Sequence, residues 1–426
     1  MDWGETSATR DSRLPVKIPR CKGTKDLLPQ DMSRFRQIEE TFRSLCHGWG
    51  YQEIRTPTLE YLHLFTSAGT LSPARLSRVY SFLDWDGWSG ERVVLRPDGT
   101  IPAARLYIEE LSHLPLARLF YIENVFSFEG ESRESWQCGA ELIGSREPQG
   151  ETELLMLALE ILDSLNLQAE IRLSHLGLLR GLISEIGLER EEEVELLQRI
   201  LRGDGEATSQ ASSKSPQVAE LLRLVLDVRK ATHGFLENLK GLLFSTLPHL
   251  AGYAADLAQI TELLHSSGRA YQADFALGQE FEYYTGIVFQ FRVGNEVVGG
   301  GGRYDELIPL IGGKEVPASG FALYMDKLVR LLEPPPPAKR ILLKSRTTST
   351  ESLKSTFETA QMLRSEGWIV ELGAGERKTT DFDWVILLDK QGGNLVLDLV
   401  RKDGLKWKNL SPDEARRKLR GNDPPT

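Results

Sequence analysis

The chain has 426 residues, of which 41% are apolar and 26% charged, a composition typical of a soluble globular protein with two or three domains. Its formal net charge of −10 disfavours wide contact with nucleic-acid phosphates, and no apolar run approaches the roughly 18 residues of a membrane span. Because the three cysteines are scattered and no apolar signal segment is present, we expect reduced thiols in the cytoplasm and neither a disulfide framework nor a zinc ribbon.

The first part of the chain predicts strands that alternate with helices. Residues 1–20 are polar and are expected to form a flexible N-terminus. Apolar residues at helical spacing predict a helix over 32–48. Strands are expected over 50–61, within 91–100 before a Pro-Asp-Gly-Thr loop, and twice within 118–144, followed by a helix over 151–165.

The second part changes in composition. Leu- and Glu-rich segments with helical periodicity predict a helical insertion at about 176–270, interrupted by a polar loop at 203–217. Strands return at 280–293 with a hairpin turn near Gly294 and Asn295, and a strand-to-helix unit follows at 320–332. Four prolines at 334–337 predict a stiff linker, after which residues 338–426 alternate as a small α/β domain. The fold class is therefore α+β, with a core over 21–335.

The C-terminal segment differs from the core in charge. Residues 338–426 carry 17 Lys or Arg and 13 Asp or Glu, whereas the remainder of the chain is acidic. A basic face is consistent with RNA contact, but clustered Lys and Arg are more often a solvated surface. The sequence therefore favours a solvated surface over nucleic-acid binding.

The common catalytic motifs do not occur. The glycine-rich GGGGRYDEL segment lacks the Gly-Lys-Ser/Thr ending of a phosphate-binding loop, and no histidine pair has metal-ligand spacing. No G-x-S-x-G elbow marks a serine nucleophile. We expect no metal ion, no cofactor and no catalytic nucleophile.

The chain resembles histidyl-tRNA synthetases in six ordered blocks: GTKDLLP (23–29), LRPDGT (95–100), ENVFSFEGESRESWQCGAELIG (123–144), EYYTGIVFQF (282–291), GGRYDEL (301–307) and GFALYMDKL (320–328). The resemblance covers about residues 20–335 and, more loosely, the C-terminal domain, which is similar to a shortened anticodon-binding domain. It implies the class II aminoacyl-tRNA synthetase core, an antiparallel sheet flanked by helices. It also implies a homodimer paired through the first helix and strand, with Phe35, Phe42, Ile54 and Leu59 as apolar residues for that contact.

Three positions that carry arginine in the synthetases differ in this chain. The resemblance aligns them with Ser127, Gln279 and Lys327, and Glu280 stands where a neighbouring glycine is expected. Such cations stabilise negative charge that develops during adenylation, and losing one donor typically lowers the rate by roughly 100- to 1000-fold. Lysine keeps the charge but not the bidentate geometry of arginine. The sequence therefore predicts a chain without catalytic residues.

The amino-acid half of the synthetase site is retained. The resemblance assigns Asp98, Thr100 and Gln137 to the ammonium group of histidine, Glu141 and Tyr284 to its imidazole, and Gln279 to the place of the arginine that binds its carboxylate. An ammonium group requires acceptors, and an imidazole pairs with an acceptor and a hydroxyl. We therefore expect histidine binding, with a leftover polar network inside the sheet as the alternative. Glu123 and Glu129 are expected to be structural or surface groups.

A synthetase-like body without the catalytic arginines resembles the regulatory subunits of ATP phosphoribosyltransferase, the first enzyme of histidine biosynthesis; EYYTGIVF, GGRYD and PASGFAL are especially similar. The resemblance implies a non-catalytic chain that assembles with a short-form catalytic subunit and makes it responsive to free histidine. The C-terminal domain departs from that group, which generally lacks one. Two alternatives remain open: an active histidyl-tRNA synthetase, and a synthetase-derived adaptor that binds RNA or protein.

Overall fold

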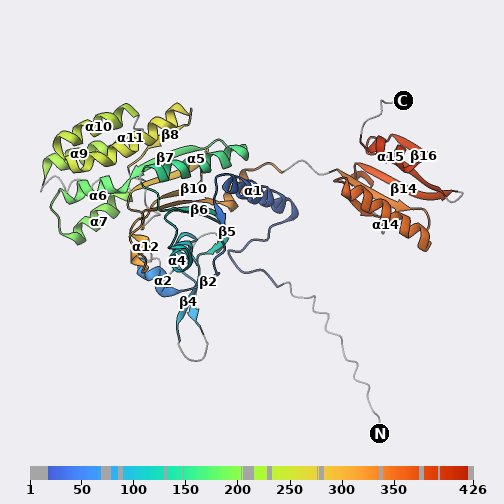
Figure 1. The fold of residues 1–426 in the computed structure, drawn as a ribbon, viewed down its shortest axis with the longest axis horizontal. Helices are drawn as coiled ribbons and strands as arrows, with labels where there is room; N and C mark the ends of the chain where they lie inside the picture. Colours follow the sequence, from blue (N-terminus) through green and yellow to red (C-terminus); the bar gives the residue numbers. More distant parts are fainter. Residues whose placement is uncertain are drawn as a thin grey trace, which may run out of the picture. The chain divides into compact units, whose positions relative to one another are not determined.

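The computed structural model describes residues 18–68, 78–84, 90–128, 132–146, 148–202, 204, 215–227, 233–275, 277, 283–334, 339–373, 379–391 and 394–420. The chain divides into two compact units, residues 1–334 and 335–426 (Figure 1). Among the residues that the structure describes, no helix combines the length and the hydropathy needed to cross a membrane.

An eight-stranded sheet forms the centre of the first unit. Its strand order is β1-β5-β6-β11-β10-β9-β7-β8. The strands are β1 (Gln52–Glu53), β5 (Ala117–Phe126), β6 (Glu134–Ile143), β11 (Ala318–Tyr324), β10 (Glu296–Arg303), β9 (Ile287–Val293), β7 (Glu170–His175) and β8 (Tyr271–Ala273). The six central strands pair antiparallel, and only the outermost pairs, β1 with β5 and β7 with β8, are parallel. This is the α+β, class II synthetase-like architecture that the resemblance implies.

Helices α1 (Pro29–Gly48), α5 (Gln149–Ser164) and α13 (Met325–Leu331) cover one face of this sheet. The ring of Phe42 on α1 contacts Phe120 on β5 and Phe321 on β11, with ring centroids 5.9 Å and 6.3 Å apart. Phe35 and Phe42 are thus buried within the chain. The expectation that these two side chains serve a dimer contact is wrong, because the sheet of the same chain already covers them.

The opposite face carries shorter elements. They are α2 (Leu62–Ser67), α4 (Thr100–Leu106) with its π-helical extension (Tyr107–Leu111), α12 (Leu307–Leu310), and a small sheet of β2 (Leu59–Tyr61), β4 (Arg92–Leu95) and β3 (Ser81–Leu83). Arg105 on α4 donates through Nη2 to Glu60 Oε1 at 2.7 Å and through Nε to Oε2 at 3.0 Å, which ties the small sheet to α4.

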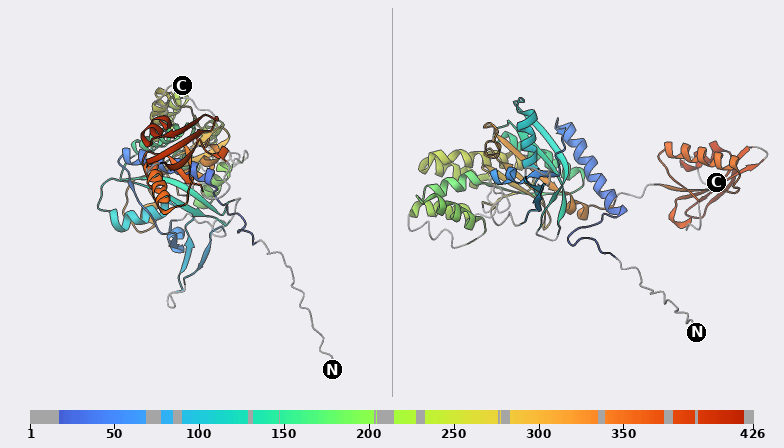
Figure 2. Two further views of the ribbon diagram at one scale, coloured as in Figure 1. Left: turned by 90° about the vertical axis from the view of Figure 1, so that its right-hand side faces the viewer. Right: turned by 90° about the horizontal axis from the view of Figure 1, so that it is seen from below.

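The segment expected to be a helical insertion contains helices α6 (Leu176–Ser184), α7 (Arg190–Leu201), α9 (Pro216–Asp227), α10 (His233–Thr246) and α11 (Ala251–Ser266). These helices gather beyond β7 and β8, as the green and yellow elements of Figures 1 and 2 show. Most of the polar loop at 203–217 lies outside the described residues.

The second unit is a five-stranded sheet of order β13-β12-β14-β15-β16. Its elements are β12 (Arg340–Ser345), α14 (Thr350–Ser365), β13 (Ile369–Leu372), β14 (Trp384–Gln391), β15 (Asn394–Arg401), β16 (Lys406–Leu410) and α15 (Pro412–Leu419). Sequence analysis did not identify β16 or α15. The capping box of α15, in which Ser411 and Glu414 each accept from the other's backbone N–H, is a signal that could have found the helix.

Two predicted strands are shorter than expected. The segment 50–61 forms β1 and β2 with a break between them, because the backbone N–H of Thr56 donates to the Glu123 carboxylate at 2.6 Å and Pro57 has no N–H for a ladder. Of the strand predicted over 280–293, residues 280–282 lie outside the described residues and β9 begins at Ile287. The hairpin turn at Gly294 is present, with a positive φ of 59°.

Candidate functional site

One face of β6 carries the residues from which the candidate site is built. Side chains alternate along a strand, so Gln137, Gly139 and Glu141 share a face, opposite to the helix α1 side. In the ladder with β5, Tyr121 is paired with Gly139, and in the ladder with β11, Gly320 is paired with Glu141. The site therefore lies on the central strands, over a part of the sheet with small residues.

Glu141 is the centre of this face and is completely buried. Three hydroxyl groups donate to its carboxylate: Thr100 at 2.8 Å and Tyr121 at 3.3 Å to Oε1, and Tyr304 at 2.5 Å to Oε2. Burial raises the pKa of Glu141 from 4.5 to about 8, against the opposing effect of these hydrogen bonds. No cationic group among the described residues contacts this carboxylate.

Glycines make room for the rings that surround Glu141. A Cβ on Gly139 would lie 2.1 Å from Tyr121 Cζ, and a Cβ on Gly99 would lie 2.4 Å from Tyr121 Cε2. Real Cβ atoms never approach so closely, so the ring of Tyr121 occupies space that only glycine leaves open. The loop before α4 and strand β6 thereby hold Tyr121 against the carboxylate from two sides.

Asp98 lies beside this cluster in the turn before α4. Its Oδ1 accepts from the backbone N–H of Ile101 in the first turn of α4 at 2.9 Å, and its Oδ2 accepts from the Tyr283 hydroxyl at 3.3 Å. The ring of Tyr283 lies 4.8 Å from that of Tyr284. Burial raises the pKa of both tyrosines well above the usual value, with Asp98 and Glu141 adding to the effect.

The structure brings together most of the residues that the resemblance assigns to histidine. Thr100 and Glu141 are hydrogen-bonded to one another, although the resemblance assigns them to opposite ends of the ligand. Tyr284 is buried next to Tyr304, with ring centroids 6.4 Å apart. Gln137 is half-buried on the face of Glu141, four residues or about 13 Å along β6. Gln279 lies outside the described residues.

Sequence reasoning missed Tyr121, Tyr283 and Tyr304 as members of the cluster. Tyr304 belongs to the GGRYDEL block, in which the sequence indicates no ligand contact. The preceding Arg303 forms an ion pair with Glu151 of α5 at 2.7 Å and donates to Asp305 at 3.0 Å, and so fixes the end of β10 that carries Tyr304. The sequence signal that could have found Tyr304 is its position after Arg303 and four glycines at 299–302. A strand of glycines has no side chains of its own and leaves room for such a polar contact.

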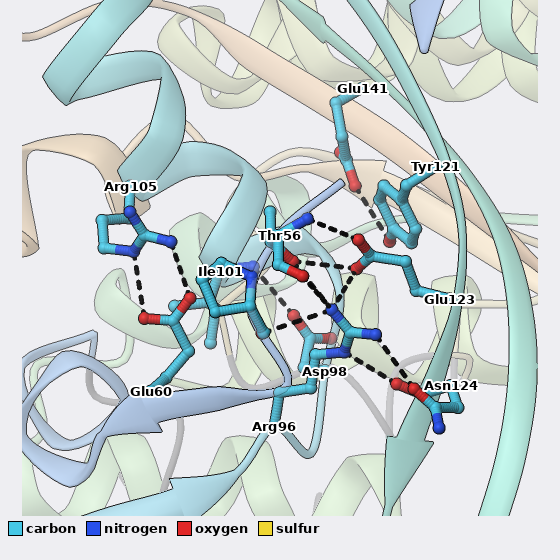
Figure 3. A network of polar contacts seen from close by, with 11 residues as sticks. Thr56, Glu60, Arg96, Asp98, Ile101, Arg105, Tyr121, Glu123, Asn124 and Glu141 are labelled. Atoms are coloured by element: carbon cyan, nitrogen blue, oxygen red, sulfur yellow. Dashed lines mark hydrogen bonds and ion pairs between the residues drawn. The ribbon is translucent and has the colours of Figure 1, made fainter. Parts of the chain in front are cut away.

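Figure 3 shows a second buried network beside the cluster. Glu123 of β5 forms an ion pair with Arg96 Nη1 at 2.7 Å and accepts from the Thr56 hydroxyl at 2.9 Å. Arg96 also donates through Nη2 to the Asn124 side chain at 3.0 Å and through Nε to the Asn124 carbonyl at 2.8 Å. Glu123 is thus a structural group, which agrees with one of the two expectations for it. Glu129 lies outside the described residues.

The positions aligned with synthetase arginines offer little charge. Ser127 supplies only a hydroxyl, and its backbone N–H donates to the Arg133 carbonyl at 3.1 Å. Lys327 on α13 lies over the ring of Tyr324 and 4.0 Å from Glu296. Glu280 lies outside the described residues. Among the described residues, no group of His, Cys, Asp or Glu side chains is arranged to hold a metal ion. The described residues of the site therefore present acceptors for a ligand with N–H donors.

The chain is similar in sequence to known proteins. A family model described as histidyl-tRNA synthetase matches residues 23–328. An ATP phosphoribosyltransferase regulatory subunit from Dehalococcoides mccartyi is 43% identical over 402 residues, which are 92% of this chain and 97% of that protein. A histidine–tRNA ligase from Methanosarcina acetivorans is 32% identical over 409 residues, 90% of this chain and 95% of the ligase.

A solved structure shows the same likeness. The crystal structure of an ATP phosphoribosyltransferase regulatory subunit/histidyl-tRNA synthetase from Bacillus halodurans superposes with a TM-score of 0.75 at 26% identity. The match covers 88% of this chain and 99% of the other. The similarity therefore includes fold and sequence over nearly the whole of both proteins.

Proposed function

The chain belongs to the histidyl-tRNA synthetase family, and from this premise we propose that it is the regulatory subunit of an ATP phosphoribosyltransferase, acting in the first step of histidine biosynthesis. The observation that carries the proposal is the 43% identity to a regulatory subunit over almost the whole length of both chains. The ligase from Methanosarcina acetivorans matches a similar length at 32% identity.

The chain itself performs no adenylation in this proposal. Support comes from Ser127, which has no charge, and from Lys327, which lies beside Glu296 and Tyr324. Adenylation requires cations aimed at the phosphates and at the attacking carboxylate. Catalysis therefore resides on the partner, which we take to be a short-form catalytic subunit.

Free histidine is the proposed effector. Glu141 is held by three hydroxyls and lies beside Asp98, so the cluster offers two carboxylates to a ligand with an imidazole and an ammonium group. Burial without a cation favours the protonated form of Glu141, and a ligand that supplies N–H donors and positive charge would favour the ionised form instead. Binding of histidine here is the route by which the subunit senses the product of the pathway.

The assembly contains a homodimer of the core and the catalytic subunit, in the cytoplasm. The unpaired cysteines Cys21, Cys46 and Cys138 are consistent with a reducing compartment. We assign residues 338–426 the role of a shortened anticodon-binding domain and expect no nucleic-acid partner for it.

Co-expression of the tagged chain with a short-form catalytic subunit from the same genome tests the proposal. We expect the two proteins to co-purify, the catalytic subunit to be active only in the complex, and histidine to inhibit that activity. A catalytic subunit that does not co-purify, or whose activity and histidine response are unaffected by the chain, would contradict the proposal.

A further inference from the structure

Helix α4 connects the buried carboxyl group of Glu141 to the small sheet of β2, β3 and β4. At its first residue, the Thr100 hydroxyl donates to Glu141 Oε1 at 2.8 Å. Near its other end, Arg105 donates through Nη2 and Nε to the two carboxylate oxygens of Glu60 on β2, at 2.7 Å and 3.0 Å (Figure 3). The two contacts lie about 8 Å apart along the helix axis. One short helix therefore touches both the site and the small sheet.

Both ends of α4 are held by further contacts. Asp98, in the turn before the helix, accepts from a backbone N–H of the first turn at 2.9 Å. Arg105 also donates through Nη1 to Glu109 of the π-helical turn at 2.6 Å, so its guanidinium is bound on two sides. Ala103 and Ala104 are buried, and neither has a flexible side chain that could absorb a displacement. A short helix packed in this way moves as a rigid unit.

The chain segment that joins β4 to α4 is anchored separately. Arg96 follows β4 and pairs with Glu123 of β5 at 2.7 Å, and it donates to the side chain and the carbonyl of Asn124 as well. Because these contacts are buried, the segment follows β5 rather than α4. The pair of Arg105 with Glu60 reaches β2 independently of this anchor, and is therefore the contact through which α4 acts on the small sheet.

We propose that Arg105 is a positioning residue that transmits occupancy of the site to the small sheet. The inference rests on the proposed function, because it gives the route by which an effector at the same site is sensed. A ligand bound to both Glu141 of β6 and Asp98 bridges the large sheet and the turn before α4. The bridge holds α4 in place, and Arg105 in turn holds Glu60 and strand β2. Ligand binding thereby stabilises a surface that lies outside the site.

The surface that this route reaches is apolar. Leu59, Tyr61 and Phe82 lie on the face of the small sheet opposite to Glu60, and each is 45–49% exposed. A twofold contact of the proposed homodimer at this sheet would cover these side chains in both copies. An effector that orders the sheet then strengthens that contact, and by reciprocity the dimer binds the effector more tightly than the monomer does.

Hydrogen exchange of the full-length chain, measured by mass spectrometry with and without saturating histidine, tests the inference. The peptide that covers β2 is the readout, because β2 has no proposed contact with the ligand. In the wild type, we expect histidine to slow exchange in this peptide by about threefold or more. A merely structural role of Arg105 would change exchange equally with and without histidine, whereas coupling changes the difference between the two.

The double variant Arg105→Gln with Glu60→Gln removes the ion pair without leaving a buried charge unpaired. We expect calorimetry to give a Kd of histidine within about fivefold of the wild-type value, and the slowing of exchange in β2 to disappear. The matched control is Arg118→Gln with Glu153→Gln, which removes another bidentate pair, at 2.7 Å and 2.9 Å, between β5 and α5. We expect this control to bind histidine and to keep the slowing.

Three outcomes would overturn the inference alone. They are histidine binding to the wild type without slowed exchange in β2, slowing that survives in the double variant, and loss of histidine binding in the double variant, which would show that Arg105 supports the site itself. A wild type that does not bind histidine would overturn the effector assignment of the proposed function and this inference with it. Co-purification with the catalytic subunit decides the regulatory role separately.

Discussion

Gly320 of β11 lies directly opposite Glu141 of β6, so close that a Cβ on Gly320 would stand 1.7 Å from Glu141 Oε2. The buried carboxylate thus occupies the volume that a side chain on the neighbouring strand would need. The PASGFAL block has glycine at this position because any larger residue would move the group at the centre of the site.

Gly320→Ala should therefore disturb the site and the sheet together. We expect overpacking to lower the free energy of unfolding by about 1–3 kcal/mol. Histidine binding should weaken by about tenfold or more, since Glu141 leaves its three hydroxyl partners. Denaturant titration and calorimetry measure the two effects. Gly252→Ala on α11, where a Cβ meets no atom within 4 Å, is the control and should be neutral or slightly stabilising.

Glu123→Ala should destabilise the fold. The substitution leaves Arg96 buried without its carboxylate and removes an acceptor from Thr56. Breaking a buried ion pair in this way typically costs about 3–5 kcal/mol. The control is Glu53→Ala, which removes a partly exposed pair with Arg43 and should cost less than about 1 kcal/mol. Equal denaturation midpoints for the two variants would refute this assignment.

Much of the site could be predicted from sequence because short blocks carry it. Asp98 and Thr100 come from LRPDGT, and Glu141 and Tyr284 come from two other blocks. The tyrosines that hold Glu141 could not be predicted in the same way, because Tyr121 is placed by its strand pairing with Gly139 and by Gly99 across a turn. Cross-strand register depends on the whole sheet and leaves no local pattern in the sequence.

The fold was predicted in outline for a similar reason. Helical spacing located α1 and α5, and the turn at Gly294 located the β9–β10 hairpin. The apolar face of α1 could not be assigned to its partner from the sequence, since Phe42 is equally suited to a dimer contact and to the sheet that covers it. Periodicity identifies a buried face but not what buries it.

The stability of the protein should depend on pH through Glu141. Its pKa is raised to about 8, so between about pH 5 and 8 the folded chain keeps a proton that the unfolded chain has released, and stability falls as pH rises through this window. Glu141→Gln lacks this effect. As the pH rises through this window, we expect the free energy of unfolding of the variant to increase relative to that of the wild type by up to about 1.4 kcal/mol per pH unit. Urea titrations at four pH values test this; parallel pH profiles would contradict it.

The protein should not form histidyl-adenylate. The sequence resemblance aligns Ser127 and Lys327 with arginines of the synthetases, and the loss of one such donor typically costs roughly 100- to 1000-fold in rate. Histidine-dependent exchange of pyrophosphate into ATP should stay at background, with an active histidine–tRNA ligase as the positive control. Ser127→Arg alone should not restore exchange. Clear exchange by the wild type would favour the synthetase alternative.

The core should associate as a dimer through the small sheet of β2, β3 and β4. Register places Leu59, Tyr61 and Phe82 on one face of this sheet, where each side chain remains 45–49% exposed. The other face carries Glu60, which is held by Arg105 of α4. Adjacent exposed apolar side chains of this kind mark an interaction surface, and a twofold contact would cover them in both copies.

Light scattering at micromolar concentration tests this surface. We expect a dimeric mass for the wild type and a shift toward the monomer for the double variant Leu59→Lys and Phe82→Lys, because two charges in each copy would have to be buried. Leu310→Lys on α12 is the matched control: Leu310 is 52% exposed but lies on a different element, and its replacement should leave the dimer intact. A monomeric wild type would remove the dimer from the proposal, whereas a dimer that survives the double variant would place the contact on another surface of the core.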